Sequence, residues 1–371
     1  MRIYWYWPFA REEDVALALA TPGGDDSLVV DALDRPGAPR IETDRVIVRA
    51  RLPEVDGTRE GSVRWAGSRA RTYRSRSVMR REAIATGDFD VCHVAFLNQY
   101  TDIFDLRRLA RDVALVTTVH DVLPHRSRLP VAIQHRVLDR LYRVCGTIIV
   151  HHDDVKTELL ERFAIPNERV HVVPHWVSPF RDPDDRRVLS GDHTVLFFGT
   201  FRANKGIEVL LAAIEQLGPK SGIRFHMAGR GDAHMERKVL EAAERNPSLT
   251  AEVGWITPER KSELLQSADL SVLPYTSFSS QSGVLHDAFG SHLPVIVSDV
   301  GALRSSVERT GAGWVVRPNS AADLKAAITN AFADQQGWQS ASDGAREVAI
   351  DQSPERVGTA LRAVYASVVR L

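Results

Sequence analysis

The sequence predicts an α/β protein made of two doubly wound domains, each with a parallel sheet between layers of helices. Short β-branched or aromatic runs alternate with longer segments of helical period, which is typical of parallel strands joined by crossover helices. These runs form two series, separated at 178–193 by a stretch rich in Pro, Asp and Arg. The length of 371 residues, of which 44% are hydrophobic, is enough for two cores of ordinary size.

The two series place the expected strands and the domain limits. The first contains IYWYW, SLVVDAL, DVCHVAF, ALVTTVHD, GTIIVHH and VHVVP, and the second contains TVLFFG, IRFHMAG, AEVGWI, LSVLPY, PVIVSD and GWVVR. We predict a first domain over 1–178 and a second over 190–350, with 178–193 as the linker. The last segment, 352–371, has helical period, and we expect it to pack back on the first domain. Ligands of open parallel sheets bind beyond the carboxyl ends of the strands, so two facing sheets would frame a cleft.

Composition excludes several function classes. Lys and Arg total 47 against 48 Asp and Glu, a formal net charge of -1, so the chain has no overall charge that indicates nucleic acid. Cys92 and Cys145 are too few for a disulfide framework and lack zinc-site spacing. The N-terminal residues have no signal-peptide apolar core, and no apolar run reaches membrane-spanning length. We expect a cytoplasmic protein that does not bind nucleic acid.

The segment Gly199-Thr-Phe-Arg-Ala-Asn-Lys-Gly206 joins an apolar strand to a helix-period run and carries two cations three residues apart. Backbone N–H groups and the positive end of a helix favour a phosphate at such a junction. Arg202 offers a bidentate fork and Lys205 a point charge, so the pair suits two linked phosphates. We predict a diphosphate site here; the alternative is that both side chains are solvated at a helix start.

A second junction with a glycine follows the run LSVLP. Ser282, Gly283 and Val284 would present backbone amides at a helix start, where a phosphate can dock, and Asp287 lies about one turn further along. Its carboxylate would accept hydrogen bonds from ribose hydroxyls; the alternative is a serine N-cap with a surface Asp. Gly229-Arg-Gly-Asp, half of a dinucleotide fingerprint, fits close approach of the backbone to a nucleotide.

The order of these features resembles the second domain of GT-B glycosyltransferases, specifically the large retaining family 4. Over 195–330 the resemblance rests on both junctions and on Met-Ala-Gly-Arg-Gly-Asp, Val-Gly-Trp-Ile, Ala-Asp-Leu-Ser-Val-Leu-Pro and Pro-Val-Ile-Val-Ser-Asp-Val-Gly. In the first domain it rests on Phe89-Asp-Val-Cys-His, Thr117-Thr-Val-His-Asp and Arg169-Val-His-Val-Val-Pro. It implies two Rossmann-like domains facing across a cleft. The implied reaction transfers a sugar from a nucleoside-diphosphate sugar to a hydroxyl acceptor, which would be a glycan, a lipid phosphate or a small molecule.

The resemblance also implies roles for particular residues. Arg202, Lys205 and His120 would be catalytic, with the two cations on the donor diphosphate and His120 facing the donor sugar. The implied sugar contacts are His120, Ser279 and Gln281, and the implied nucleotide contacts are Gly199, Arg202, Lys205, Gly229, Arg230, Trp255, Ile256, Ser282, Gly283, Val284 and Asp287. Ser279 and Asp287 stand where the family usually has two Glu residues, and Trp7-Pro-Phe-Ala-Arg-Glu-Glu replaces a Gly-Gly loop. The identity of the sugar therefore stays open.

Charge development explains why two cations suit this reaction. Negative charge grows on the departing phosphate, so preorganised cations stabilise the transition state more than the ground state. Arg202 and Lys205 would then act in place of a metal, and we expect neither a metal nor a cofactor besides the donor. Asp88-Phe-Asp90 resembles a metal motif of another glycosyltransferase fold but fits a turn before a strand. For His120 the alternative is a strand-end histidine bonded locally.

One segment of the first domain is rich in arginine and interleaved with Trp65 and Tyr73. Its arginines are Arg59, Arg64, Arg69, Arg71, Arg74, Arg76, Arg80 and Arg81. Helical spacing places Ala66, Ala70, Tyr73 and Ser77 on one face and most arginines elsewhere. The segment would meet an anionic membrane surface, a lipid-phosphate acceptor or a charged glycan, or else form a solvated arginine-rich helix.

Two other readings of the whole chain stay open. The first is another GT-B enzyme, such as a nucleotide-sugar epimerase or a phosphorylase. The second is a catalytically inactive protein that binds nucleotide sugars, which Ser279 in the place of the usual Glu permits.

Overall fold

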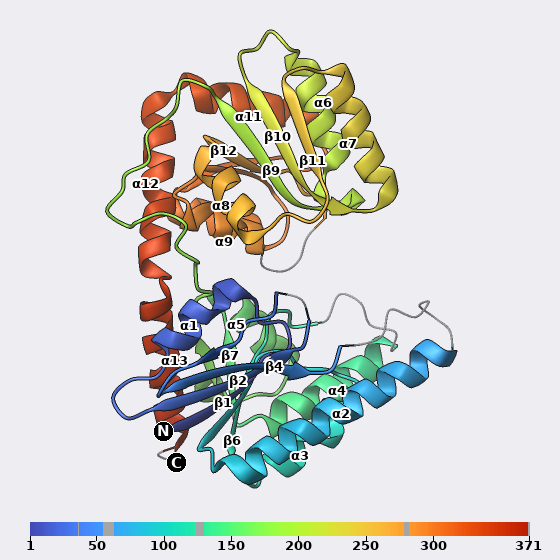
Figure 1. Cartoon of the computed structure of the whole chain (residues 1–371), viewed down its shortest axis with the longest axis vertical. Coiled ribbons are helices and arrows are strands. Elements are labelled where there is room, and N and C mark those ends of the chain that lie inside the picture. Colours follow the sequence, from blue (N-terminus) through green and yellow to red (C-terminus); the bar gives the residue numbers. More distant parts are fainter. Residues whose placement is uncertain (36, 55–62, 124–129, 278–281, 370–371) are drawn as a thin grey trace. The chain divides into compact units, whose positions relative to one another are not determined.

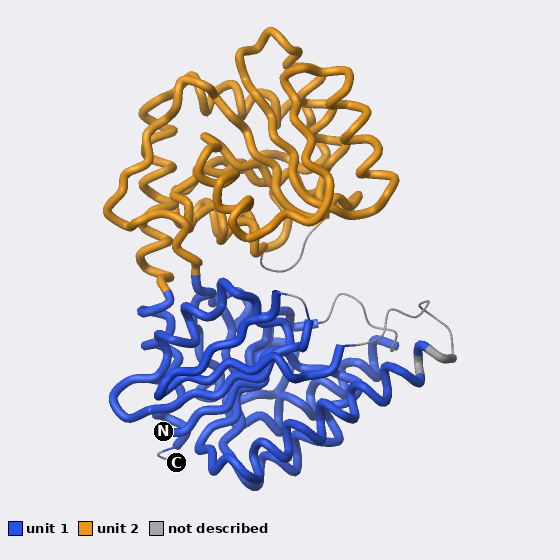
Figure 2. Tube along the Cα trace, in the orientation of Figure 1, with its two compact units in different colours: residues 1–176, 354–371 blue, residues 177–353 orange. Residues whose placement is uncertain are grey.

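The computed structural model describes residues 1–35, 37–54, 63–123, 130–277 and 282–369, which fall into two compact units. Unit 1 comprises Met1–Trp176 and Pro354–Leu371, and unit 2 comprises Val177–Ser353 (Figure 2). Both units are α/β domains built on a mainly parallel sheet, as the sequence predicts. Within the described ranges, no helix combines the length and the apolarity needed to cross a bilayer.

Unit 1 contains an eight-stranded sheet in the order β3-β4-β2-β1-β5-β6-β7-β8. The strands are β1 (Arg2–Tyr6), β2 (Ser27–Leu33), β3 (Ile41–Glu42), β4 (Val46–Leu52), β5 (Val91–Val94), β6 (Ala114–Thr118), β7 (Thr147–Val150) and β8 (Val170–Val172). Only β3 and β4 pair antiparallel. The sequence does not predict β4, because Arg49 and Arg51 interrupt its apolar pattern. Both guanidinium groups reach the buried Asp31 carboxylate of β2, at 3.1 and 2.6 Å.

Helices cover both faces of this sheet. They are α1 (Val15–Ala20), α2 (Val63–Gly87), α3 (Leu106–Leu109), α4 (Val131–Val144), α5 (Asp153–Arg162) and α13 (Pro354–Val369), with short 3₁₀ turns at Glu12–Asp14, Asp102–Phe104 and Asn167–Arg169 (Figure 1). Successive side chains of a strand point to opposite faces. Ile3 and Trp5 of β1 therefore lie in a core with α1 and α13, and Tyr4 and Tyr6 lie in a core with α2, α3, α4 and α5.

Unit 2 contains a six-stranded sheet in the order β11-β10-β9-β12-β13-β14, and every neighbouring pair is parallel. The strands are β9 (Thr194–Phe201), β10 (Arg224–Gly231), β11 (Leu249–Val253), β12 (Leu270–Leu273), β13 (Val295–Ser298) and β14 (Gly313–Val316). The helices are α6 (Ile207–Leu217), α7 (Ala233–Arg245), α8 (Pro258–Ser267), α9 (Gly283–Gly290), α10 (Ala302–Thr310), α11 (Ala321–Ala333) and α12 (Gln335–Asp351), with a 3₁₀ turn at Ala203–Lys205. Val195 and Phe197 of β9 face a core with α6, α7 and α11, and Leu196 faces a core with α8, α9 and α10.

The predicted linker at 178–193 is wrong, because this stretch lies within unit 2. Arg187 is buried, and its guanidinium donates to the carbonyl oxygens of Ser291, Leu265 and Gln266 at 2.5, 2.8 and 2.8 Å. A buried guanidinium is tolerated when its N–H groups are bonded in this way. Most of the stretch is exposed, as its charged composition suggests, but the buried Arg187 fixes it to unit 2.

Each sheet has a central strand at which the strand order reverses direction. In unit 1 this strand is β1, between β2 and β5, and in unit 2 it is β9, between β10 and β12. In doubly wound sheets the connections leave such a strand in opposite directions, which opens a crevice beyond its carboxyl end. The candidate residues of both units lie at or after the carboxyl ends of these strands and of their neighbours in the sheets.

Candidate functional site

The junction between β9 and α6 has a backbone that requires glycine. Gly206 has φ of 70°, and a Cβ at this position would overlap the carbonyl oxygen of Pro274, after β12. Gly199 of β9 lies opposite Gly229 of β10, and a Cβ on Gly229 would overlap the Gly199 carbonyl oxygen. The glycines that the sequence singles out thus allow three strand ends to approach one another.

The two predicted phosphate ligands lie together in this junction. Arg202 ends β9 and is exposed, whereas Lys205 is half-buried with its Nζ 3.7 Å from the centre of the Tyr275 ring. Burial and then the charge of Arg202 lower the pKa of Lys205 from 10.5 to about 8. The two charges therefore lie close enough to repel each other, and an anion between them would relieve this repulsion.

The start of α9 lies on the other side of Tyr275. Ser282 is its N-cap residue, and the Ser282 Oγ lies 3.2 Å from the Tyr275 hydroxyl, whose pKa burial raises to about 12. Gly283 is exposed and has open space where a Cβ would project, and Val284 is half-buried. The first turn of α9 can therefore accept a small group in front of its amides. Ser279 and Gln281, the predicted sugar contacts, lie outside the described residues.

Asp287 is a buried, ion-paired carboxylate, so the alternative of a surface Asp is wrong. Its side chain is 9% exposed, and both of its oxygens lie 3.5 Å from the Nζ of Lys261 on α8. Sequence reasoning missed Lys261. The available signal was its spacing from Leu264 and Leu265, which places the lysine on the inward face of an amphipathic helix.

Arg230 lies in β10, next to its final residue, and Trp255 follows β11; the two side chains form a cation–π pair. The guanidinium carbon of Arg230 lies 4.8 Å from the centre of the Trp255 ring, and Trp255 is 70% exposed. Such an exposure is unusual for so large an apolar side chain, and the neighbouring Ile256 is half-buried. The pair offers a flat surface beside the glycine junction, as expected of nucleotide contacts.

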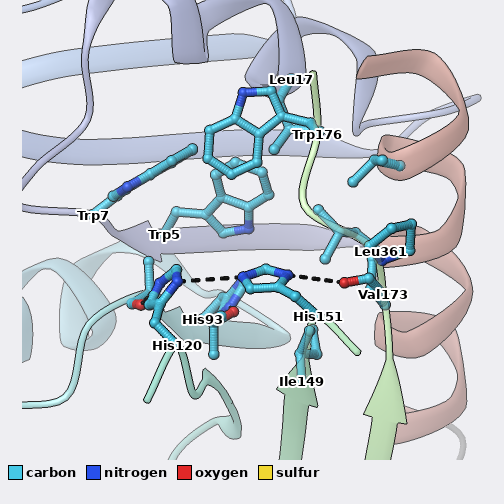
Figure 3. A pocket seen from close by; sticks show the side chains of 14 residues that line it. Trp5, Trp7, Leu17, His93, His120, Ile149, His151, Val173, Trp176 and Leu361 are labelled. Atoms are coloured by element: carbon cyan, nitrogen blue, oxygen red, sulfur yellow. Dashed lines mark hydrogen bonds between the residues drawn. The ribbon is translucent and has the colours of Figure 1, made fainter. Parts of the chain in front are cut away.

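The strand ends of unit 1 carry histidines instead of cations. A pocket there is walled by indoles on one side and imidazoles on the other (Figure 3). The indoles belong to Trp5, Trp7 and Trp176, and the imidazoles to His93, His120 and His151. The pocket lies on the face of β1 that packs against α1 and α13.

Both ring nitrogens of His120 are occupied by protein groups. Its Nε2 lies 3.0 Å from the Ala95 carbonyl oxygen, and its Nδ1 lies 3.3 Å from Nε2 of His151 (Figure 3). Nδ1 of His151 in turn lies 2.9 Å from the Val173 carbonyl oxygen. Burial lowers the pKa of His120 to about 3 and that of His151 to about 4. His120 is therefore neutral at physiological pH and is held by local bonds, not poised as a free base.

The third histidine joins the sheet to the C-terminal helix, a contact that sequence reasoning missed. Nδ1 of His93 lies 2.6 Å from the Tyr365 hydroxyl of α13, and its Nε2 lies 2.8 Å from Thr118 Oγ1. Tyr365 also accepts a hydrogen bond of 2.9 Å from the Trp5 indole. Residues far apart in the chain therefore build one buried polar network behind the pocket.

Two Rossmann-like units, with glycine junctions and cations at the strand ends of the second, define the GT-B class. The structure of Anabaena Alr3699/HepE in complex with UDP and glucose matches the chain with a TM-score of 0.68, covering 99% of each chain at 16% identity. This likeness confirms the predicted GT-B fold.

Family comparisons identify the family within that class. Residues 13–181 match the family Glycosyltransferase Family 4, and residues 192–334 match Glycosyl transferases group 1. The chain belongs to this group 1, family 4 type of glycosyltransferases, as the sequence predicts.

Curated relatives of the chain have diverse names. The glycogen synthase of Mycobacterium tuberculosis is 25% identical over 269 residues, which cover 70% of this chain and 64% of the relative. The phosphatidyl-myo-inositol mannosyltransferase of Mycolicibacterium smegmatis is 27% identical over 298 residues, covering 77% and 74%. The chain thus spans less than two thirds of the glycogen synthase.

Proposed function

We propose that the protein is a retaining glycosyltransferase that moves a sugar from a nucleoside-diphosphate sugar to a hydroxyl acceptor, without a bound metal. The observation that carries the proposal is the pair Arg202 and Lys205, two mutually repelling cations at a glycine junction before α6. A diphosphate carries negative charge on two linked groups, which matches two cations at one junction. UDP and glucose in the HepE complex support this class of donor.

The transition state is where these cations would matter most. As the bond between the anomeric carbon and the phosphate oxygen breaks, charge accumulates on the departing diphosphate. Arg202 and Lys205 would neutralise that charge without a metal, and the amides of Ser282, Gly283 and Val284 would bind a phosphate oxygen. Family membership, rather than geometry, supports retention at the anomeric carbon.

The remaining donor contacts follow from the strand ends of unit 2. Asp287 would accept hydrogen bonds from the ribose, with the Lys261 ammonium group holding its carboxylate in place. Arg230 and Trp255 would stack with the base, and Ile256 would complete that surface. We assign His120 a positioning role towards the sugar, because its nitrogens are already bonded within unit 1.

A donor screen tests the proposal directly. UDP-, GDP-, ADP- and TDP-sugars are incubated with the protein in EDTA, with and without candidate hydroxyl acceptors, and product is resolved with its anomeric configuration. We expect one donor to be consumed in EDTA and the product to retain its configuration. Inversion at C2 of the sugar would identify an epimerase, and tight binding without turnover would identify an inactive binding protein.

The acceptor and the membrane contact are further proposals. The name of the mannosyltransferase relative supports a lipid-linked acceptor. The structure, however, leaves less basic surface on α2 than the sequence suggests, because Arg76 and Arg80 are buried and Arg81 pairs with Asp105 at 3.3 Å. Arg59 lies outside the described residues.

Liposome co-sedimentation tests the membrane contact. The exposed Arg71 and Arg74 are the arginines of α2 best placed for an anionic surface. We expect binding to anionic vesicles at low salt and a loss of that binding when both are changed to Gln. Equal binding to neutral and anionic vesicles would contradict the contact.

A further inference from the structure

Unit 1 has a second pocket, on the face of β1 opposite to the pocket of Figure 3. Tyr6 at the end of β1 lines it, together with Tyr73, Arg76 and Arg80 of α2 and with Asn98 after β5. None of these residues belongs to the donor contacts proposed above. The pocket is polar, and its basic side chains point inward although they come from a helix that the sequence suggests is solvated.

Arg76 is buried without a carboxylate partner. The residue is 5% exposed; its Nε donates to the Pro53 carbonyl oxygen at 2.8 Å, and its guanidinium carbon lies 5.2 Å from the centre of the Tyr73 ring. These contacts use one N–H and one face of the group. Within the described ranges, its two terminal nitrogens have no hydrogen-bond or ion-pair partner.

Its neighbours on the helix do have partners. Arg80 is 1% exposed, and its Nη2 lies 2.9 Å from Asp102 Oδ1 and 2.7 Å from Asp105 Oδ2. Arg81 reaches the other oxygen of Asp105 at 3.3 Å. Arg80 and Arg81 therefore take up the carboxylates of Asp102 and Asp105. Arg76, the third guanidinium group, has no carboxylate partner among the described residues.

Two further donors in this pocket lack acceptors. Nη1 of Arg80 is buried and has no partner among the described residues. Burial raises the pKa of the Tyr6 hydroxyl to about 12, so this group keeps its proton, and no described group accepts it. The buried Nη1 of Arg80 and the uncompensated charge of Arg76 are both unfavourable, and one bound oxyanion could satisfy both and also accept from the Tyr6 hydroxyl.

We propose that this pocket binds a compact oxyanion, a phosphate or carboxylate group, through Arg76, Arg80 and Tyr6. The paired N–H groups of a guanidinium match two oxygens of such an anion. Tyr73 and Phe9 add aromatic walls to the same pocket, against which the body carrying the anion can pack. That this body is the acceptor rests on the proposed function; the oxyanion site itself does not.

Phosphate binding to the full chain tests the site without turnover. Because the donor junction is expected to bind phosphate as well, the measurement uses protein that already carries Arg202→Ala and Lys205→Ala. Thermal unfolding is followed against inorganic phosphate at constant ionic strength. We expect saturable stabilisation, which Arg76→Gln weakens about tenfold or more and which Arg74→Gln, on the exposed side of α2, leaves intact.

The same experiment separates binding from a structural role. Without phosphate, Arg76→Gln is expected to unfold at the same temperature or higher, because an uncompensated buried charge is removed. Full phosphate stabilisation in Arg76→Gln, or an equal loss of stability with and without phosphate, would overturn the proposal.

Acceptor kinetics then test whether the bound oxyanion is part of the acceptor. These measurements use protein that retains Arg202 and Lys205. Matched acceptors with a phosphate, a carboxylate or a neutral group are compared in wild-type protein and in Arg76→Gln. We expect the variant to raise KM about tenfold for one class of anionic acceptor and to leave the neutral acceptor unchanged. An equal effect on all three would contradict an acceptor role but would leave the phosphate measurement standing.

Discussion

The strand ends of the two units differ in charge although both sheets place them at a reversal of strand order. In unit 2 they carry cations, and burial, together with the charge of Arg202, lowers the pKa of the neighbouring Lys205 to about 8. In unit 1 they carry indoles and imidazoles, and burial lowers the pKa of His93 and His120 to about 3. The unit 2 edge therefore presents two neighbouring cations, whereas the histidine pocket of unit 1 is neutral and bonded internally.

This difference shows what the shared topology decides and what it leaves to side chains. Strand order fixes where a ligand can bind, because the connections diverge at the central strand. Which ligand binds depends on the few residues that follow each strand. We therefore expect substitutions at the unit 2 cations to change catalysis, and substitutions in the histidine pocket of unit 1 to change stability or positioning.

The largest expected effect is the loss of the unit 2 cations. Arg202→Ala or Lys205→Ala removes a charge that stabilises the departing diphosphate, so each should cost about 2 to 4 kcal/mol of transition-state stabilisation. The measurement is kcat/KM for the donor found in the screen. A matched control is Arg304→Ala, an exposed arginine of the same unit paired with Asp299 at 2.7 Å. Wild-type kinetics in both variants would refute their catalytic role.

The backbone of the same junction gives the next effect. Gly206→Ala forces a side chain into the left-handed region and against the Pro274 carbonyl, and we expect a loss of about 3 kcal/mol of unfolding free energy. Gly311→Ala is the matched control, since Gly311 is also left-handed, with φ of 63°, but has open space around the Cβ position. That control should cost about 1 kcal/mol. Equal losses in urea unfolding would show that the close approach adds nothing.

Those glycines also show which parts of the fold and site could be predicted from sequence. A junction such as Gly199–Gly206 has a local signature, because the backbone conformation and the nearby cations are encoded within a few residues. The alternation of short apolar runs with helical segments likewise predicts most strands. Strands β3 and β4 are the exceptions, and in β4 the contacts that permit its arginines come from Asp31 on another strand.

Long-range pairing accounts for the features that the sequence did not predict. Three features become evident only when distant segments pack together: Lys261 beside Asp287, Tyr365 beside His93, and the buried Arg76, which has no carboxylate partner among the described residues. Likewise, the stretch 178–193 has a linker-like composition, yet Arg187 finds its acceptors about 80 to 100 residues further along. Composition cannot report such partners.

The pH dependence of activity tests whether the charged form of Lys205 is the one that acts on the donor. The pKa of Lys205, about 8, predicts that kcat/KM falls as the pH rises through this value, by about tenfold per unit well above it. A bound diphosphate stabilises the ammonium form of Lys205 and so raises its pKa. The fall in kcat should therefore begin at a higher pH than the fall in kcat/KM. The Lys205→Arg variant, whose guanidinium stays charged, should lose this alkaline limb. A wild-type profile that is flat from pH 7 to 9.5 would contradict the assignment.

The smallest effect is expected from the neutral histidines of unit 1. Their folded pKa values lie below the ordinary 6.5, so the unfolded chain takes up protons in a range where the folded chain does not. Stability is then fully present above pH 6.5 and is lost as the pH falls towards 4 and 3. Linkage gives about 0.7 kcal/mol per histidine between pH 7 and pH 6.

Urea unfolding at those two pH values measures this difference. His93→Gln should reduce the pH-dependent loss by about one histidine's share, whatever its effect on absolute stability, whereas the exposed His234→Gln in unit 2 should leave the loss unchanged. An unchanged loss in His93→Gln would mean that this imidazole is not held neutral by burial. The neutrality of the unit 1 strand ends, and with it the contrast between the two edges, would then need another cause.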